Sequence, residues 1–329
     1  MKKLMTLVVA GFLAFTLAAC SNSANTSSSS SSSTPSKVTV KSLNGSSETV
    51  DVEVTYNPSR VAVLDYAALD AIDSLGVGDK VVGTSKVSVD YLKSYSENSN
   101  IKNLGTIKEA DTEAVAACEP DVIFIGGRLA SSYDELSKIA PVVYLEIASG
   151  EGVVEGTKRI AETIGTIFGK QDQVSSLMSG YDSRIAKLKE FANGKTAMVG
   201  LCTSGSFNIL GNDGRCSLIG NEIGFNNIGD SITSSNNGST STHGNESSFE
   251  LLVSLNPEYI FVLDRDAAIG TEGAQLAQEI LANELVMGID AYKNNKIVYL
   301  STPKIWYTAE GGVKALDYML KDLESALLS

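Results

Sequence analysis

The chain has 329 residues and a formal net charge of −13 at neutral pH, from 26 basic and 39 acidic side chains. This acidic balance argues against nucleic acid as a partner, because binding a phosphate backbone needs a basic surface. Apart from the N-terminal segment, roughly 290 residues of ordinary composition remain, which suits two domains or one large domain.

The four cysteines form no recognisable framework. Cys20 lies near the N-terminus, and Cys118, Cys202 and Cys216 are scattered, without a CxxC or Cys/His zinc spacing. Cys202 and Cys216 could pair across neighbouring strands. Otherwise the three later cysteines are buried free thiols.

The N-terminal segment has the pattern of an export signal. Two lysines precede an apolar run over 4–17 that is too short for a comfortable membrane span, and small residues stand just before Cys20. This lipobox resembles those of bacterial lipoproteins and implies a signal peptide over 1–19 and a lipid on Cys20. An ordinary secretory signal with a chance cysteine is the alternative. The Ser-rich residues 20–37 predict a flexible tether.

Strands and helices alternate along 38–170 and predict a first α/β lobe with a mostly parallel sheet. The lobe opens with a hairpin over Val38–Tyr56 that turns at Asn44–Gly45. Further strands are expected at 60–64, 80–83, 122–125 and 141–145, and helices at 65–75, 112–118 and 153–168.

A long helical pattern over 171–193 separates the two halves of the chain. Its apolar residues recur at helical spacing, and some twenty residues at about 1.5 Å each make a rod of about 30 Å. Such a rod is suited to connect two lobes stiffly. The second lobe, 194–329, is expected to contain strands at 196–201, 207–210, 259–263 and 296–300, and helices over 274–285 and from Gly311.

The clearest internal signal is a unit that occurs twice. In both copies a glutamate opens a short helix, a proline follows seven residues later, an apolar strand comes next, and an arginine stands fifteen residues after the glutamate. Agreement at three positions predicts two copies of one α/β unit, facing each other in two lobes. The glutamates are Glu113 and Glu250, the prolines Pro120 and Pro257, and the arginines Arg128 and Arg265.

Enzyme signatures are missing from the sequence. It contains no GxSxG, GxxxxGK[ST] or HExxH motif, and the glycines at 76, 78 and 83 break the dinucleotide-binding spacing. The single histidine, His243, lies in a Gly-, Ser- and Asn-rich loop, and no candidate nucleophile stands out. We therefore expect no enzyme activity and no permanently bound cofactor.

Taken together, the lipobox, the Ser-rich tether, the two α/β lobes, the connecting helix and the paired Glu–Pro–strand units resemble a known family. It is that of the substrate-binding lipoproteins of ABC importers for ferric siderophores and cobalamin, and the likeness covers essentially the whole mature chain. It implies the class III periplasmic-binding-protein fold, with two Rossmann-like lobes joined by one long helix. It also implies a monomer anchored by lipid on the extracytoplasmic face of the cell membrane, as on a Gram-positive surface.

Within this family the chain looks most like the binders of ferric catecholate siderophores, of the petrobactin and enterobactin types. The resemblance implies a ligand cleft lined by three arginines, Arg128, Arg215 and Arg265. Trp306 is grouped with these ligand-binding residues, although a core position is its alternative.

The resemblance also assigns iron ligands and a docking surface. It implies that His243 and Tyr307 can ligate iron when the siderophore leaves coordination sites open. Glu113 and Glu250 match the paired glutamates by which this family docks arginines of the ABC permease subunits. Iron would then enter only as Fe(III) in its siderophore complex.

The chemistry of these residue types agrees with the resemblance. A ferric tris-catecholate carries about three negative charges, which three guanidinium groups can meet with charge-assisted hydrogen bonds of roughly 1.5–3 kcal/mol each. Fe(III) suits phenolate oxygen and tolerates imidazole, and the metal would lower the phenol pKa enough to ionise it. A tetradentate bis-catecholate leaves two iron sites open, whereas a hexadentate ligand leaves none.

Several alternatives stay open at this point. The ligand could be another iron chelate, haem or cobalamin, although haem and cobalamin would not call for three arginines and hydroxamates would need fewer. A surface adhesin or structural lipoprotein is a different class that leaves the arginines unexplained. His243 could be an ordinary loop residue, and Glu113 and Glu250 could be helix-start carboxylates favoured by the macrodipole.

Overall fold

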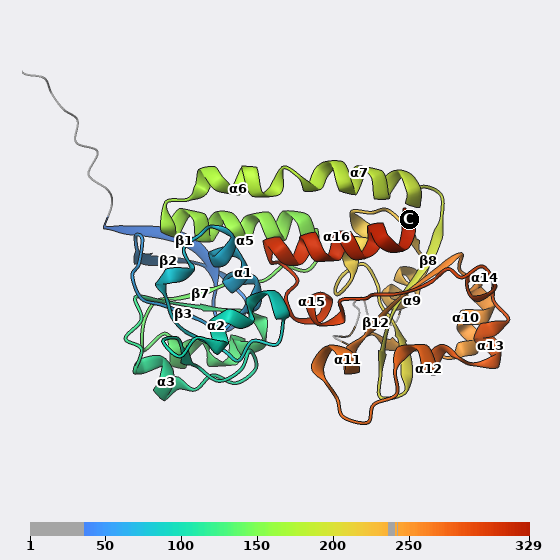
Figure 1. Cartoon of the computed structure of the whole chain (residues 1–329), viewed down its shortest axis with the longest axis horizontal. Helices are drawn as coiled ribbons and strands as arrows, with labels where there is room; N and C mark the ends of the chain where they lie inside the picture. The colour runs from blue at the N-terminus through green and yellow to red at the C-terminus, as the bar shows by residue number, and fades with distance from the viewer. Residues whose placement is uncertain (1–35, 236–240, 242) are drawn as a thin grey trace, which may run out of the picture. The chain divides into compact units, whose positions relative to one another are not determined.

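Two β-sheets, one in each half of the chain, form the framework of the protein (Figure 1). The structure is a computed structural model that describes residues 36–235, 241 and 243–329. The predicted signal peptide, Cys20 and most of the tether lie outside the described residues. Both sheets belong to one compact unit, Pro35–Ser329.

The first lobe is built on a seven-stranded sheet in the order β2-β1-β7-β6-β3-β4-β5. The strands from β7 to β5 are parallel, and the predicted hairpin adds β1 and β2 antiparallel at one edge. Strands β3, β6 and β7 are buried along their whole length, as expected for parallel strands covered on both faces. The strands are β1 (Lys37–Leu43), β2 (Thr49–Thr55), β3 (Val61–Val63), β4 (Val81–Thr84), β5 (Lys102–Asn103), β6 (Val122–Ile125) and β7 (Val142–Tyr144).

Two capping residues mark helix ends in this lobe. The Asp65 side chain accepts a hydrogen bond from the Ala68 N–H at 2.9 Å and starts α1. Helix α5 ends at Gly169, whose φ of 65° is left-handed. The helices are α1 (Tyr66–Ser74), α2 (Lys93–Glu97), α3 (Thr112–Ala116), α4 (Tyr133–Leu136) and α5 (Val153–Phe168), with 3-10 turns at Gly78–Lys80, Asp90–Leu92 and Gly127–Ser132.

The predicted connecting helix over 171–193 is present as two helices in line, α6 (Gln171–Met178) and α7 (Tyr181–Ala192) (Figure 1). It is interrupted at Ser179 and Gly180, because glycine is a poor helix former and lowers the preference for continuing the turn. Helix α7 is held in place by Arg184, which donates to Asp317 at 2.6 Å and to Glu324 at 2.7 Å.

The second lobe has a sheet in the order β11-β9-β8-β12-β13, with β10 paired to β8. Strands β8, β10, β12 and β13 are parallel. At the other edge, β9 is antiparallel to β8, and β11 is antiparallel to β9. The predicted mixture of strands and crossover helices is therefore confirmed in both lobes. The strands are β8 (Thr196–Thr203), β9 (Ser206–Ile209), β10 (Asn226–Asn227), β11 (Asn245–Glu246), β12 (Tyr259–Asp264) and β13 (Ile297–Tyr299).

The helices of the second lobe differ from the prediction, since one predicted helix is divided and several further short helices are present. The segment 274–285 holds two short helices, because the Asn283 side chain accepts from the Leu285 N–H at 2.8 Å and starts a new helix. Helix α15, which carries Tyr307, was not predicted. The helices are α8 (Ser217–Asn221), α9 (Asp230–Ser235), α10 (Phe249–Leu255), α11 (Arg265–Ile269), α12 (Ala277–Leu281), α13 (Glu284–Met287), α14 (Asp290–Lys293), α15 (Pro303–Thr308) and α16 (Val313–Leu327).

Helix α16 returns to the first lobe and ties the two halves together. The buried Asp70 carboxylate of α1 accepts from the N–H groups of Lys314 and Ala315, each at 2.9 Å. One continuous apolar cluster runs from the first sheet through α1, α5, α7 and α16 to the second sheet, and smaller clusters fill the outer face of each sheet. The lobes therefore share a core and are not joined by a free linker alone.

Cys118, Cys202 and Cys216 are free and buried, so the possible disulfide between Cys202 and Cys216 is not formed. Among the described residues, no helix combines the length and the apolar character that a membrane crossing requires.

Candidate functional site

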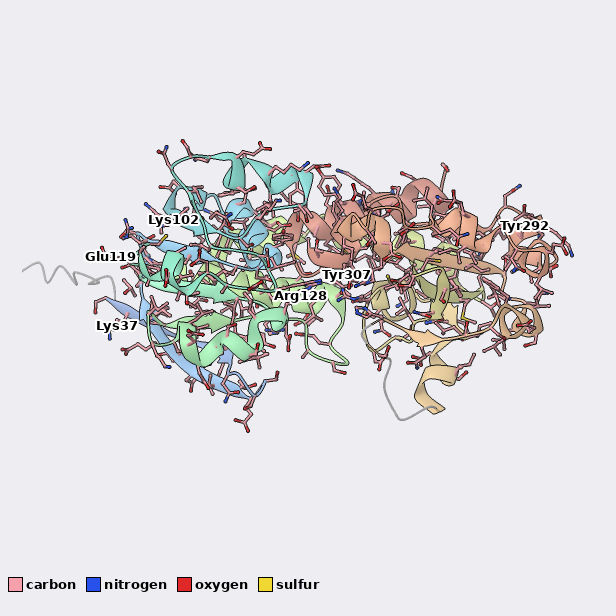
Figure 2. The ribbon with its side chains drawn as sticks, turned by 90° about the horizontal axis from the view of Figure 1, so that it is seen from below. Lys37, Lys102, Glu119, Arg128, Tyr292 and Tyr307 are labelled. Carbon is pink, nitrogen blue, oxygen red and sulfur yellow. The ribbon has the colours of Figure 1, made fainter. Side chains whose placement is uncertain are left out.

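A cavity of about 640 Å³ lies where the two lobes meet, at the carboxyl ends of parallel strands. The first lobe contributes Arg128, which follows β6, and Glu146, which follows β7. The second lobe contributes Arg215, from the segment after β9, and Tyr307, from α15. Figure 2 shows Arg128 and Tyr307 next to each other in the middle of the molecule.

Three arginines from separate elements converge on one residue, Tyr307. Arg128 Nη2 and Arg215 Nη1 both donate to the Tyr307 carbonyl oxygen, each at 2.8 Å. Arg265 Nε lies 3.1 Å from the Tyr307 hydroxyl. The Arg215 guanidinium also stacks over the Tyr307 ring, 4.2 Å from its centroid. The structure thus brings all three predicted arginines to Tyr307, although only Arg128 and Arg215 are among the residues that line the cavity.

The repeated unit explains how two of these arginines reach the site. Glu119 and Asn256, the residues before the two prolines, both have left-handed backbones, with φ of 44° and 38°. Each proline then leads into a buried strand, β6 or β12, and an arginine follows where the strand ends. Because both copies share this backbone path, they deliver Arg128 and Arg265 to the carboxyl ends of the two sheets.

A different set of contacts positions Arg215. The segment after β9 is held by the buried Asn227, whose amide donates to Leu210 O at 2.9 Å and to Asn212 Oδ1 at 3.1 Å. Cys216, the residue after Arg215, has a left-handed backbone with φ of 61° and is the N-cap of α8. These contacts fix the turn that carries Arg215.

The electrostatic surroundings of the arginines are unequal. Arg265 is paired with Asp266 at 3.2 Å. By contrast, within the described part of the chain no carboxylate lies within 4.0 Å of the Arg128 guanidinium. Burial and the neighbouring Arg215 lower the pKa of Arg128. Two guanidinium groups that share one neutral acceptor favour an anionic ligand, which would relieve their mutual repulsion.

The cavity also contains carboxylates that the sequence analysis missed. A methyl group on Gly126 would lie 2.3 Å from Asp65 Oδ2, and one on Gly127 would lie 2.1 Å from Glu146 Oε2. The glycine pair before Arg128 therefore leaves room for these two carboxylates beside the arginine. Burial raises the pKa of Asp65 in spite of its cap hydrogen bonds and Arg128. Both acids follow strand ends, which is a signal that the sequence already offered.

Glu310 is a further carboxylate of the cavity wall. Its Oε1 atom is buried and has no hydrogen-bond partner among the described residues. Burial raises its pKa to about 7, although Arg215 and the Cys216 N–H act in the opposite direction. Nothing in the sequence around Glu310 indicated this position.

Of the two predicted iron ligands, only Tyr307 is among the residues that line the cavity. Tyr307 is only 3% exposed and lies among the arginines. His243 is exposed and is absent from the residues that line the cavity, although Ser241 lines it. The His243 carbonyl accepts from Asn208 at 3.0 Å, next to the pairing of β11 with β9.

Trp306 does not lie in the cleft, which corrects its assignment as a ligand-binding residue. Its side chain is fully buried, and Nε1 donates to Asp322 Oδ2 at 3.0 Å. Helix α15 turns Trp306 into the core and its neighbour Tyr307 toward the cavity. The role of Trp306 is packing, and removing such a ring typically costs about 3–5 kcal/mol.

Glu113 and Glu250 occupy equivalent exposed positions in the first turns of α3 and α10. The helices start at Asp111 and Ser248, whose side chains accept from the N–H groups of Ala114 and Leu251. Backbone and Ser248 hydrogen bonds lower the pKa of Glu250. Their placement fits both a helix-start role and a docking role, one glutamate on each lobe.

These features define a class of protein. Two α/β lobes that share a core, with a cavity between the carboxyl ends of their sheets, are the architecture of a two-lobed solute-binding protein. A family model for periplasmic binding proteins matches residues 61–303. The chain therefore belongs to the periplasmic binding protein family, which is a family of binding proteins and not of enzymes. The fold and the family expected from the sequence are confirmed.

Individual relatives agree with this assignment. The petrobactin-binding protein YclQ of Bacillus subtilis strain 168 is 33% identical over 330 residues, covering 99% of each chain. Its crystal structure gives a TM-score of 0.79 over 89% of this chain and 99% of that chain. The probable siderophore-binding lipoprotein YfiY of the same organism is 27% identical, covering 100% of this chain and 99% of that protein. The periplasmic catecholate-siderophore binding protein VctP of Vibrio cholerae is 30% identical, with a TM-score of 0.76 over 88% of this chain and 100% of that chain.

The raised pKa of Glu310 predicts a pH-dependent stability. An ordinary glutamate of the unfolded chain titrates near 4.5, whereas folded Glu310 titrates near 7. The folded state therefore binds more protons between these values, and stability falls as pH rises through this window, by roughly 3 kcal/mol in full. Glu310→Gln should raise the free energy of unfolding strongly at pH 8 and little at pH 5, measured by urea denaturation.

The exposed Glu155 provides the control for this measurement. Glu155→Gln should change the free energy of unfolding by the same small amount at both pH values. An equal effect of Glu310→Gln at pH 5 and pH 8 would show that Glu310 titrates normally.

Proposed function

We propose that this protein is the extracytoplasmic binding component of an ABC importer and that it captures a ferric catecholate siderophore for iron uptake. The observation that carries the proposal is the convergence of Arg128, Arg215 and Arg265 on Tyr307 from both lobes. The relatives support the broader part, since YclQ is named for petrobactin, YfiY for siderophores and VctP for catecholate siderophores. The catecholate class rests on the match between three guanidinium groups and the negative charge of a ferric catecholate.

The arginines match the charge and geometry of such a ligand. A ferric tris-catecholate spreads about three negative charges over its oxygens, and guanidinium forks donate paired hydrogen bonds to such oxygens. Arg128 and Arg215 both donate to one carbonyl oxygen, that of Tyr307. Exchange of this neutral acceptor for an anionic one strengthens each hydrogen bond about twofold. Haem and cobalamin do not need this concentration of positive charge.

Tyr307 is the better placed of the two proposed iron ligands. Its hydroxyl oxygen accepts a hydrogen bond from Arg265 Nε at 3.1 Å, and phenol oxygen is a ligand type that suits Fe(III). For a bis-catecholate with two open iron sites, we propose Tyr307 as one ligand. His243 is exposed and does not line the cavity, so we rank it second as an iron ligand.

We further propose that the protein is held at the membrane by a lipid on Cys20 and delivers its ligand by docking Glu113 and Glu250 on the permease. The two glutamates lie at matching positions of the two repeated units, one on each lobe. Because the lobes share a continuous core, the spacing of this pair should change little when ligand binds.

The arginines should control affinity. Arg128→Gln and Arg215→Gln should each weaken binding of a ferric tris-catecholate by about 10- to 100-fold, because each loses a charge-assisted hydrogen bond of roughly 1.5–3 kcal/mol. The measurement is quenching of Trp306 fluorescence at fixed ionic strength, and Trp306 is the only tryptophan of the chain. Lys158→Gln, on the exposed side of α5, is the matched control and should bind as the wild type does. Unchanged affinity in both arginine variants would contradict the proposed site.

The glutamate pair should control delivery and not affinity. Glu113→Lys combined with Glu250→Lys should abolish uptake of the labelled ferric chelate by cells while leaving its dissociation constant unchanged, because the charge that meets the permease is reversed. The control is Glu97→Lys combined with Glu190→Lys, two exposed glutamates away from the helix starts in question. Uptake that survives the first pair, or is lost equally with the second, would remove the docking assignment.

A further inference from the structure

Glu310 is a cavity-wall residue that the proposed function has not used. It lies in the segment between α15 and α16, in the same wall as Arg215, Ser217 and Thr308. Its carboxyl accepts a hydrogen bond from the Cys216 N–H. Its buried Oε1 atom has no donor within hydrogen-bond distance in the part of the chain that the structure describes. A buried carboxylate oxygen without a donor is costly, and a proton on that oxygen would turn it into a donor.

A second carboxylate stands close by. Glu222, at the end of α8, accepts from the Val154 N–H of α5 at 3.1 Å through Oε1, and its buried Oε2 likewise lacks a partner among the described residues. Burial raises the pKa of Glu222, and the charge of Glu222 raises the pKa of Glu310. Arg215 and Arg128 are the cations that face Glu310, and the Cys216 thiol is buried beside it. Two carboxylates in one desolvated place cannot both ionise easily.

We propose that Glu310 is a proton-carrying positioning residue of the ligand site: its carboxyl is protonated when the anionic chelate is bound, so that no second negative charge stands in the cavity wall beside the chelate and Arg215 is left to face the ligand. The proton comes from solvent, so that capture of the ligand takes up a proton and no bond other than O–H is formed or broken. This inference rests on the proposed function, because it requires an anionic ligand in this cavity.

The direction of the coupling follows from the charges in the cavity. In the free protein Arg215 lies near enough to favour the ionised form of Glu310. A bound anion adds negative charge next to Glu310 and draws the Arg215 guanidinium toward itself. Both changes favour the protonated carboxyl. At pH 7, where free Glu310 is about half protonated, binding should therefore take up about half a proton, and affinity should fall by up to about tenfold per pH unit above that.

Isothermal titration calorimetry tests this coupling. The intact extracytoplasmic protein is titrated at pH 7 with a ferric hexadentate tris-catecholate in two buffers of different ionisation enthalpy, which gives the number of protons taken up. The wild type should take up about half a proton more than Glu310→Gln, and the difference removes any proton uptake by the chelate itself. Glu310→Gln, whose amide is neutral at every pH as the protonated carboxyl is, should bind at pH 8 at least as tightly as the wild type and should lose the pH dependence.

The exposed Glu155 gives the control, since Glu155→Gln should keep the proton uptake of the wild type. A second measurement needs no variant: the wild-type dissociation constant should rise between pH 7 and pH 8.5 while the absorbance of the chelate shows unchanged iron coordination. Binding with equal proton uptake in the wild type and in Glu310→Gln would overturn the inference and leave the proposed function standing. Failure of the wild type to bind any ferric catecholate would overturn both.

Discussion

The structure depends on two guanidinium groups that share one carbonyl oxygen. Arg128 comes from the first lobe and Arg215 from the second, and both donate to Tyr307 at 2.8 Å. Two cations held at one neutral acceptor, in a partly desolvated cavity, form a site that an anion completes. The same contact joins the lobes, so the ligand site and the interface between the lobes are built from the same residues.

The framework around this contact is arranged to keep it in place. The repeated unit brings Arg128 and Arg265 to the ends of two sheets, while Asn227 fixes the turn of Arg215. Helices α5, α7 and α16 cover a core that runs through both lobes (Figure 1). The carboxylates of Asp65, Glu146 and Glu310 line the same cavity. The cavity wall therefore carries side chains of both charge signs.

Local sequence patterns predicted the parts of this protein that depend on local physics. Apolar periodicity predicted α5, and the spacing of glutamate, proline and arginine predicted the two matching units. Both predictions hold because residues close in sequence determine these elements. Gly180 and Asn283 are residues that disfavour a continuous helix, but the apolar periodicity on both sides of them predicted one uninterrupted helix in each place. Contacts between distant segments were not predictable. The direction of Trp306 into the core and the position of Glu310 in the cavity wall depend on how α15 packs against α11, α16 and β12.

The most direct test of the ligand class is a titration panel on the wild-type protein. Ferric tris- and bis-catecholates, a ferric hydroxamate, haem and cobalamin are added in turn, and Trp306 fluorescence and the catecholate-to-iron charge-transfer band are followed together. We expect tight binding, measured as fluorescence quenching, for the catecholates only. The charge-transfer band should shift for the bis-catecholate as the Tyr307 oxygen coordinates the iron. Tight binding of the hydroxamate, haem or cobalamin without binding of the catecholates would contradict the proposed ligand class.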